Sequence, residues 1–186
     1  MKNLKELIAN SPFKKQGHTT NVNLVNALKE IKFYNEIIIN DEITAAADEI
    51  NSNTFKLFVA SFQRESNNWS IAMQQKFIEN IIMGCKTEIT LYTTINKNTN
   101  EGCLILDGQH RVLSILNFIN GDIKPFGYSY KTLLENDVIH PRRLGTITLN
   151  ILKFDNHNDA IKFYISINEN ITHNAEDIDK AKKYII

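Results

Sequence analysis

Hydrophobic residues recur at helical spacing in several parts of this sequence. Leu24, Leu28 and Ile31 are spaced at i, i+4 and i+7 with polar residues between them, which predicts a helix over residues 21–34. Similar patterns predict further helices over residues 42–50, 70–84, 112–119, 130–135, 159–167 and 175–185. Asp41 is a candidate cap at the start of the first of these, and Ser70 and Gly84 are candidate caps at the two ends of the second.

Short runs rich in β-branched and aromatic residues predict strands over residues 54–62, 88–95 and 146–154. Residues 103–106 are wholly apolar, which is typical of a strand buried on both faces. Helices come first along the chain, and strands interleaved with helices follow. We therefore predict an α+β fold, with a helical extension over residues 1–53 and a small sheet flanked by helices over residues 54–186.

Charge and cysteine content narrow the classes of protein. The 21 basic residues balance 21 acidic ones, which argues against a strongly basic nucleic-acid coat but leaves room for a local basic patch. No apolar run has the length of a membrane helix, so we expect no membrane partner. Cys85 and Cys103 do not suggest a disulfide scaffold, and we expect a reducing, cytoplasmic setting.

The segment richest in candidate chemistry is Asp107-Gly108-Gln109-His110-Arg111, which joins a predicted strand to a predicted helix. Backbone N–H groups in the first turn of a helix attract anions, and an arginine there can clamp a phosphate through two hydrogen bonds. Asp107 could hold a Mg²⁺ that accompanies a nucleotide, or cap the helix. His110 could act as a general base, or stack on a base as a ring. A plain Asp-Gly turn with Asp107 as N-cap is an equally good interpretation.

Scarce residue types mark a second segment. The chain has four arginines, and one of them, Arg64, follows Gln63 and precedes the only tryptophan, Trp69. Together with the Asp107–Arg111 segment and the later Asn168, this order resembles the N-terminal domain of GmrSD-type modification-dependent restriction systems, within the ParB/sulfiredoxin-like superfamily. His110 departs from the usual second glutamine of the family motif, although an Asp-Gly-Gln-His-Arg form is also found in regulators of DNA phosphorothioation.

The resemblance implies a pocket for an NTP with Mg²⁺, coupled in related members to DNA cleavage or DNA clamping. The nucleotide-binding residues that it carries over are Gly108, Gln109 and Arg111 from the motif, Gln63 and Arg64 from the upstream segment, and Asn168. Asp107 and His110 are then the candidate catalytic residues, with Asp107 also the candidate metal ligand. We expect a nuclease domain, where one acts, to come from a protein partner.

These observations predict a DNA-linked nucleotide-binding module with possible NTPase or DNA-nicking activity. The alternative is a non-catalytic DNA-binding regulator, or a phage or host interaction factor, that keeps the fold. The candidate DNA-binding residues are Lys124, Lys131, Arg142 and Arg143, in and near the loops after the motif helix. A solvated loop is the competing interpretation for Arg142 and Arg143.

Overall fold

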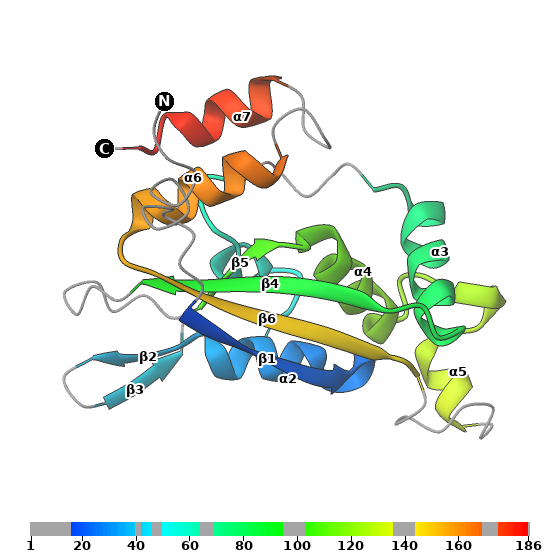
Figure 1. Cartoon of the computed structure of the whole chain (residues 1–186). Coiled ribbons are helices and arrows are strands. Elements are labelled where there is room, and N and C mark those ends of the chain that lie inside the picture. Colours follow the sequence, from blue (N-terminus) through cyan, green and yellow to red (C-terminus); the bar gives the residue numbers. More distant parts are fainter. Residues whose placement is uncertain are drawn as a thin grey trace.

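A mixed four-stranded sheet forms the centre of the molecule (Figure 1). The computed structural model describes residues 16–39, 42–45, 50–63, 69–94, 103–135, 144–168 and 175–185. In the strand order β1-β6-β4-β5, β6 pairs antiparallel with β1 and parallel with β4, and β4 pairs antiparallel with β5. The strands of this sheet are β1 (Gln16–Asn23), β4 (Thr87–Thr94), β5 (Leu104–Asp107) and β6 (Thr146–Phe154). The fold is α+β, as predicted.

Helices cover both faces of the sheet. They are α2 (Ala27–Tyr34), α3 (Ile71–Ile82), α4 (Gln109–Asn120), α5 (Tyr130–Glu135), α6 (His157–Asn168) and α7 (Ala175–Lys182), with short 3-10 turns η1 (Leu24–Asn26), η2 (Phe55–Phe58) and η3 (Pro125–Gly127). Figure 1 shows α6 and α7 together on one side of the sheet and α2 on the other. A separate hairpin consists of β2 (Glu36–Ile39) and β3 (Glu42–Ala45). Among the described residues, no helix combines the length and the apolar character needed to cross a bilayer.

Each face of the sheet has its own hydrophobic core. The larger core packs α2, α3 and α4 against alternate residues of the strands, such as Ile89, Ile105 and Leu149. The smaller core packs α6 and α7 against the opposite face, where Tyr92 and Leu106 are buried. Burial on both faces explains why the β5 sequence is almost wholly apolar.

The face beneath α6 is covered along only part of its length. Toward the ends of β4 and β6, this face is apolar and belongs to the smaller core, as at Tyr92 and Phe154. Toward the beginnings of the same strands it is polar, with Glu88, Thr90 and Asn150 exposed or half-buried. The sheet therefore presents a polar surface beside the packed helices.

Several predicted elements are confirmed almost to the residue. Ser70 is the N-cap of α3, and its Oγ accepts a hydrogen bond from the Met73 N–H at 3.3 Å. Gly84, with φ of 97°, follows the end of α3 in the left-handed conformation expected there. The bounds of β6 and α5 coincide with the predicted ones.

The predictions for the N-terminal third are wrong in three places. Residues 21–23 belong to β1 and pair with β6, although α2 does continue to Tyr34. Residues 42–45 form β3 instead of the start of a helix, because they pair with β2; Asp41 lies outside the described residues. The segment 54–62 contains the turn η2 and touches β5 through a single bridge, at Val59.

The described part of residues 1–53 packs into the main fold. In the described part of that segment, β1 is a strand of the central sheet, and Leu24, Ala27 and Ile31 are fully buried in the larger core. Strand β1 pairs with β6, which comes more than a hundred residues later, and the residues that follow β1 are buried in the same core as the later elements. The described part is therefore integral to the main fold and is not a separate helical extension.

Candidate functional site

The turn between β5 and α4 adopts an unusual backbone conformation at Gly108. Its φ of 96° and ψ of 18° lie in the left-handed region, where a side chain is disfavoured. A Cβ atom added there would also lie 3.3 Å from Ile89 Cγ1. Gly108 is the N-cap of α4, and no side chain supplies a capping hydrogen bond. The interpretation of Asp107 as the N-cap is therefore wrong.

Arg111 is anchored to the sheet through one of its three guanidinium nitrogens. Nη1 donates to the Glu88 carbonyl oxygen at 2.6 Å and lies 3.4 Å from Asp107 Oδ2. Both contacts use the same nitrogen, and among the described residues Nε and Nη2 make no hydrogen bond. The side chain is one-third exposed. The guanidinium is therefore fixed in position while retaining two donors for a ligand.

Asp107 combines exposure with a fixed position. Its side chain is 41% exposed, and only Oδ2 contacts Arg111. The described residues contain no group of three or more histidine, cysteine, aspartate or glutamate side chains that could hold a metal ion. A Mg²⁺ at Asp107 would thus need ligands from bound phosphates and water, which is the usual arrangement for this ion at nucleotide sites.

His110 and Trp69 form a stacked pair behind the turn. Their rings are almost parallel, at 19°, with centroids 5.5 Å apart, and His110 is buried. Phe77 of α3 meets the Trp69 ring edge-on at 5.5 Å. Trp69 is therefore a packing anchor that fixes the first turn of α4 against α3. This placement favours a positioning function for His110, and its catalytic role stays a prediction.

Gln63 supports β5 instead of pointing freely into the turn. Its side chain is buried, and its Nε2 donates to the Ile105 carbonyl oxygen, which also accepts from the Ala60 N–H. The Gln63 carbonyl oxygen accepts from Lys180 Nζ at 2.8 Å. Gln63 thus connects the segment before Arg64 to the strand that leads to Asp107, and to α7.

Asn168 lies at the end of α6 and is buried. Its Nδ2 donates to the Tyr164 carbonyl oxygen at 2.8 Å, one turn earlier in the helix. The Tyr164 ring packs edge-on against Phe62, with centroids 5.4 Å apart. These contacts place Asn168 in the helix layer above the sheet, while Gly108, Gln109 and Arg111 lie together in the turn.

The remaining predicted residues are placed only in part. Arg64, Arg142 and Arg143 lie outside the described residues. Lys124 precedes η3 and is exposed. Lys131 on α5 is also exposed and forms an ion pair with Glu135 at 3.6 Å. Their roles in DNA binding stay predictions.

Two contacts of the site were not predicted from the sequence. The Glu88 carbonyl oxygen holds Arg111, and the Lys180 ammonium group holds Gln63. The acceptor for Arg111 is the main-chain oxygen of Glu88, which any residue at this position would carry, so this contact leaves no pattern in the sequence. A long-range bond between Lys180 and a carbonyl oxygen leaves no pattern in the sequence.

Comparisons with protein-family models, with curated proteins and with solved structures find no match to this chain. The resemblance drawn from the motifs therefore stays a prediction.

Proposed function

We propose that this chain is a nucleotide-binding module that acts on or with DNA, and that the phosphates bind at the Asp107–Arg111 turn. The observation that carries the proposal is the arrangement of Arg111, whose Nη1 is bonded to the sheet while Nε and Nη2 make no hydrogen bond to the part of the chain that the structure describes. Two parallel N–H donors are the geometry with which arginine binds a phosphate. Gly108 supports the proposal because a glycine lets a ligand approach the backbone closely.

The helix dipole of α4 also favours the binding of an anion at the turn. The positive end of the dipole of this twelve-residue helix lies at the turn, and no side chain of the described residues caps it. Asp107 would oppose an anion by itself, but its contact with Arg111 offsets part of that charge. A nucleotide that brings Mg²⁺ removes the remaining conflict, because the ion would bind Asp107 and the phosphates together.

Thermal unfolding with and without nucleotides tests this proposal. At about 100 times its dissociation constant, a nucleotide stabilises the folded state by about 2.7 kcal/mol. For a chain of this length the melting temperature should then rise by about 5–10 °C. Arg111→Lys should remove most of the rise, because an ammonium group can keep the bond to the Glu88 carbonyl oxygen but cannot present two parallel donors. Lys131→Arg, on the exposed face of α5, is the control for the exchange of one basic side chain for another away from the turn.

A rise of the same size in Arg111→Lys would exclude a bidentate phosphate site at the turn. No rise with any nucleotide, with tripolyphosphate or with sulfate would contradict phosphate binding altogether.

A non-catalytic DNA-binding regulator, the alternative, predicts different experimental results. An NTPase should lose turnover when Asp107 is changed to Asn, whereas simple DNA binding should be indifferent to that change. If Lys124, Lys131, Arg142 and Arg143 supply the contacts, the slope of log affinity against log salt should be no steeper than about −4, at about −0.9 per neutralised phosphate. DNA binding that survives reversal of Arg142 and Arg143 to glutamate would place the DNA surface elsewhere.

A further inference from the structure

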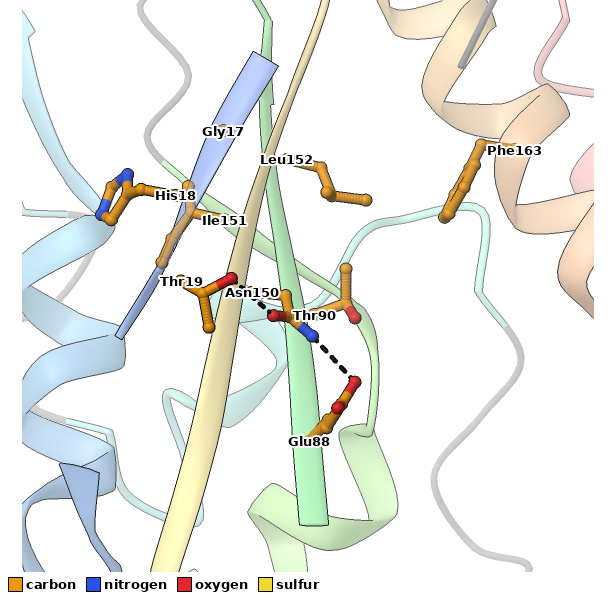
Figure 2. Close-up of a pocket in the computed structure, with 9 residues that line it drawn as sticks. All are labelled: Gly17, His18, Thr19, Glu88, Thr90, Asn150, Ile151, Leu152 and Phe163. Carbon is orange, nitrogen blue, oxygen red and sulfur yellow. Dashed lines mark hydrogen bonds between the residues drawn. The ribbon is translucent and has the colours of Figure 1, made fainter. Parts of the chain in front are cut away.

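A hollow of about 430 Å³ lies on the polar part of the sheet, beside α6 (Figure 2). Its floor is formed by β1, β4 and β6, and its apolar side consists of Leu152 and Phe163. Sites for small ligands typically measure about 300–1,000 Å³ and combine apolar walls with a few fixed polar groups. The volume and the mixed lining are therefore suited to a small organic ligand.

The polar groups of the floor are fixed by a chain of hydrogen bonds. Thr19 Oγ1 donates to Asn150 Oδ1 at 3.0 Å, and Asn150 Nδ2 donates to Glu88 Oε2 at 2.9 Å (Figure 2). Among the described residues, Glu88 Oε1 accepts no hydrogen bond, and the Thr90 hydroxyl makes none. The hollow thus offers a carboxylate acceptor beside a hydroxyl that can donate.

The apolar side favours a flat ligand. The Phe163 ring comes from α6 and the Leu152 side chain from β6, and Figure 2 shows both above Glu88 and Thr90, on the same side of β4. An aromatic ring in this space could contact Phe163 while its edge meets Glu88 and Thr90. Stacking on an aromatic side chain combined with hydrogen bonds to the ring edge is the usual way in which proteins recognise an unpaired base.

The acceptor on Glu88 and the donor on Thr90 determine which hydrogen-bonding edge of a base fits the hollow. Glu88 Oε1 can accept from an exocyclic amino group, and the Thr90 hydroxyl can donate to a neighbouring ring nitrogen. Adenine and cytosine present an amino group beside an acceptor nitrogen. Hypoxanthine and uracil present an oxygen beside an N–H group at the same positions, which would place the oxygen against the carboxylate.

The hollow and the Asp107–Arg111 turn share strand β4. The Glu88 side chain lines the hollow, while its carbonyl oxygen accepts from Arg111. Thr90 also lines the hollow and is the pairing partner of Asp107 in β5. We propose that this hollow binds the base of the nucleotide whose phosphates bind at the turn, and that it selects bases with an amino group beside a ring nitrogen. The inference rests on the proposed function.

Matched nucleotides test the selection directly. ATP and ITP differ only at this edge of the base, in the amino or oxo group and in the hydrogen on the neighbouring ring nitrogen, and so do CTP and UTP. Tripolyphosphate carries the phosphates alone. The wild type should bind ATP and CTP at least about tenfold more tightly than ITP and UTP, because ITP and UTP would set a base oxygen against the Glu88 carboxylate. Isothermal titration with all five compounds measures this.

Glu88→Gln should reverse the preference. Asn150 Nδ2 still requires an acceptor, so the new amide oxygen should take the place of Glu88 Oε2 and the new amide nitrogen should face the ligand. The variant should then favour ITP and UTP, with tripolyphosphate affinity unchanged. Glu135→Gln, on α5, is the control for charge. Phe163→Ala should weaken ATP binding about tenfold without affecting tripolyphosphate, with the exposed Phe33→Ala as its control.

Different outcomes separate the two proposals. If tripolyphosphate binds but the wild type does not distinguish ATP from ITP or CTP from UTP, the base does not lie in the hollow and only this inference fails. An unchanged preference in a folded Glu88→Gln variant overturns it as well, as does full ATP affinity in Phe163→Ala. If neither tripolyphosphate nor any nucleotide binds, the proposed function fails and the inference with it.

Discussion

Two glycines at opposite ends of α4 provide a matched test of the candidate turn. Gly108 and Gly121 both adopt the left-handed conformation, with φ of 96° and 86°. A Cβ added to Gly121 meets no atom within 4 Å, whereas one added to Gly108 lies 3.3 Å from Ile89 Cγ1. Alanine at either position carries the same backbone strain. Only Gly108→Ala adds a contact with a fully buried core residue.

The magnitudes follow from these two terms. Left-handed backbone costs about 1–2 kcal/mol for a residue with a Cβ, and the loss of unfolded-state freedom returns about 0.4–1 kcal/mol. Gly121→Ala should therefore lower stability by about 1 kcal/mol. The tight contact in the core adds about 1 kcal/mol or more for Gly108→Ala. Melting temperatures should fall by about 3 °C and about 6 °C, respectively.

Thermal and urea unfolding of both variants, with and without nucleotide, measures the difference. Nucleotide stabilisation should survive in Gly121→Ala and decrease in Gly108→Ala, because a backbone shift that relieves the 3.3 Å contact with Ile89 also moves the turn that would hold the phosphates. Equal destabilisation by the two substitutions would refute the argument that Gly108 is closely packed against β4. Full nucleotide stabilisation in Gly108→Ala would contradict close approach of phosphates to this turn.

Three further predictions concern other parts of the chain. Gly145→Ala should cost more than about 3 kcal/mol in urea unfolding, since its Cβ would lie 2.6 Å from a carbonyl oxygen in the last turn of α3; a loss below that of Gly108→Ala would contradict this. The hydrogen bond from the Phe126 N–H holds the pKa of Glu79 below its usual value of 4.5. Glu79→Gln should therefore be less stable than the wild type above pH 4.5, and the difference in unfolding free energy should vanish as the pH falls through the lowered pKa. A difference that stays constant with pH would exclude this linkage. Burial raises the pKa of Cys103 to about 11, so a thiol reagent at pH 8 should label the exposed Cys85 first, and equal labelling rates would be inconsistent with that burial.

Elements with a strong local pattern could be predicted from the sequence alone. The α3 helix has a capping serine, an apolar face and a glycine after its end, and these local signals agree with its packing. The β6 strand has alternating residues that match its burial in the sheet. The Asp107–Arg111 turn was found for the same reason, because glycine between an apolar strand and an apolar helical face is a local signal.

Elements defined by distant contacts could not be predicted in this way. The aromatic residues of segment 54–62 suggested a strand, yet Phe55 and Phe58 pack in the larger core and Phe62 packs in the smaller one. The segment passes the edge of the sheet from one core to the other, and aromatic residues serve this path as well as they serve a strand. Residues 42–45 are predicted to begin a helix, but their pairing with β2 outweighs the helix propensity of so short a segment.

The pairing of β1 with β6 has a consequence for how the chain folds. Val22 faces Ile147 across the sheet, so the first and last strands of this sheet are separated by more than a hundred residues of chain. Closing so long a loop carries a large entropic cost before any contact compensates it, which slows folding. During synthesis on the ribosome, β1 has no partner in this sheet until β6 emerges. Strand β1 is therefore exposed to non-native pairing until β6 has been synthesised, and completion of the sheet should be the slow step of folding.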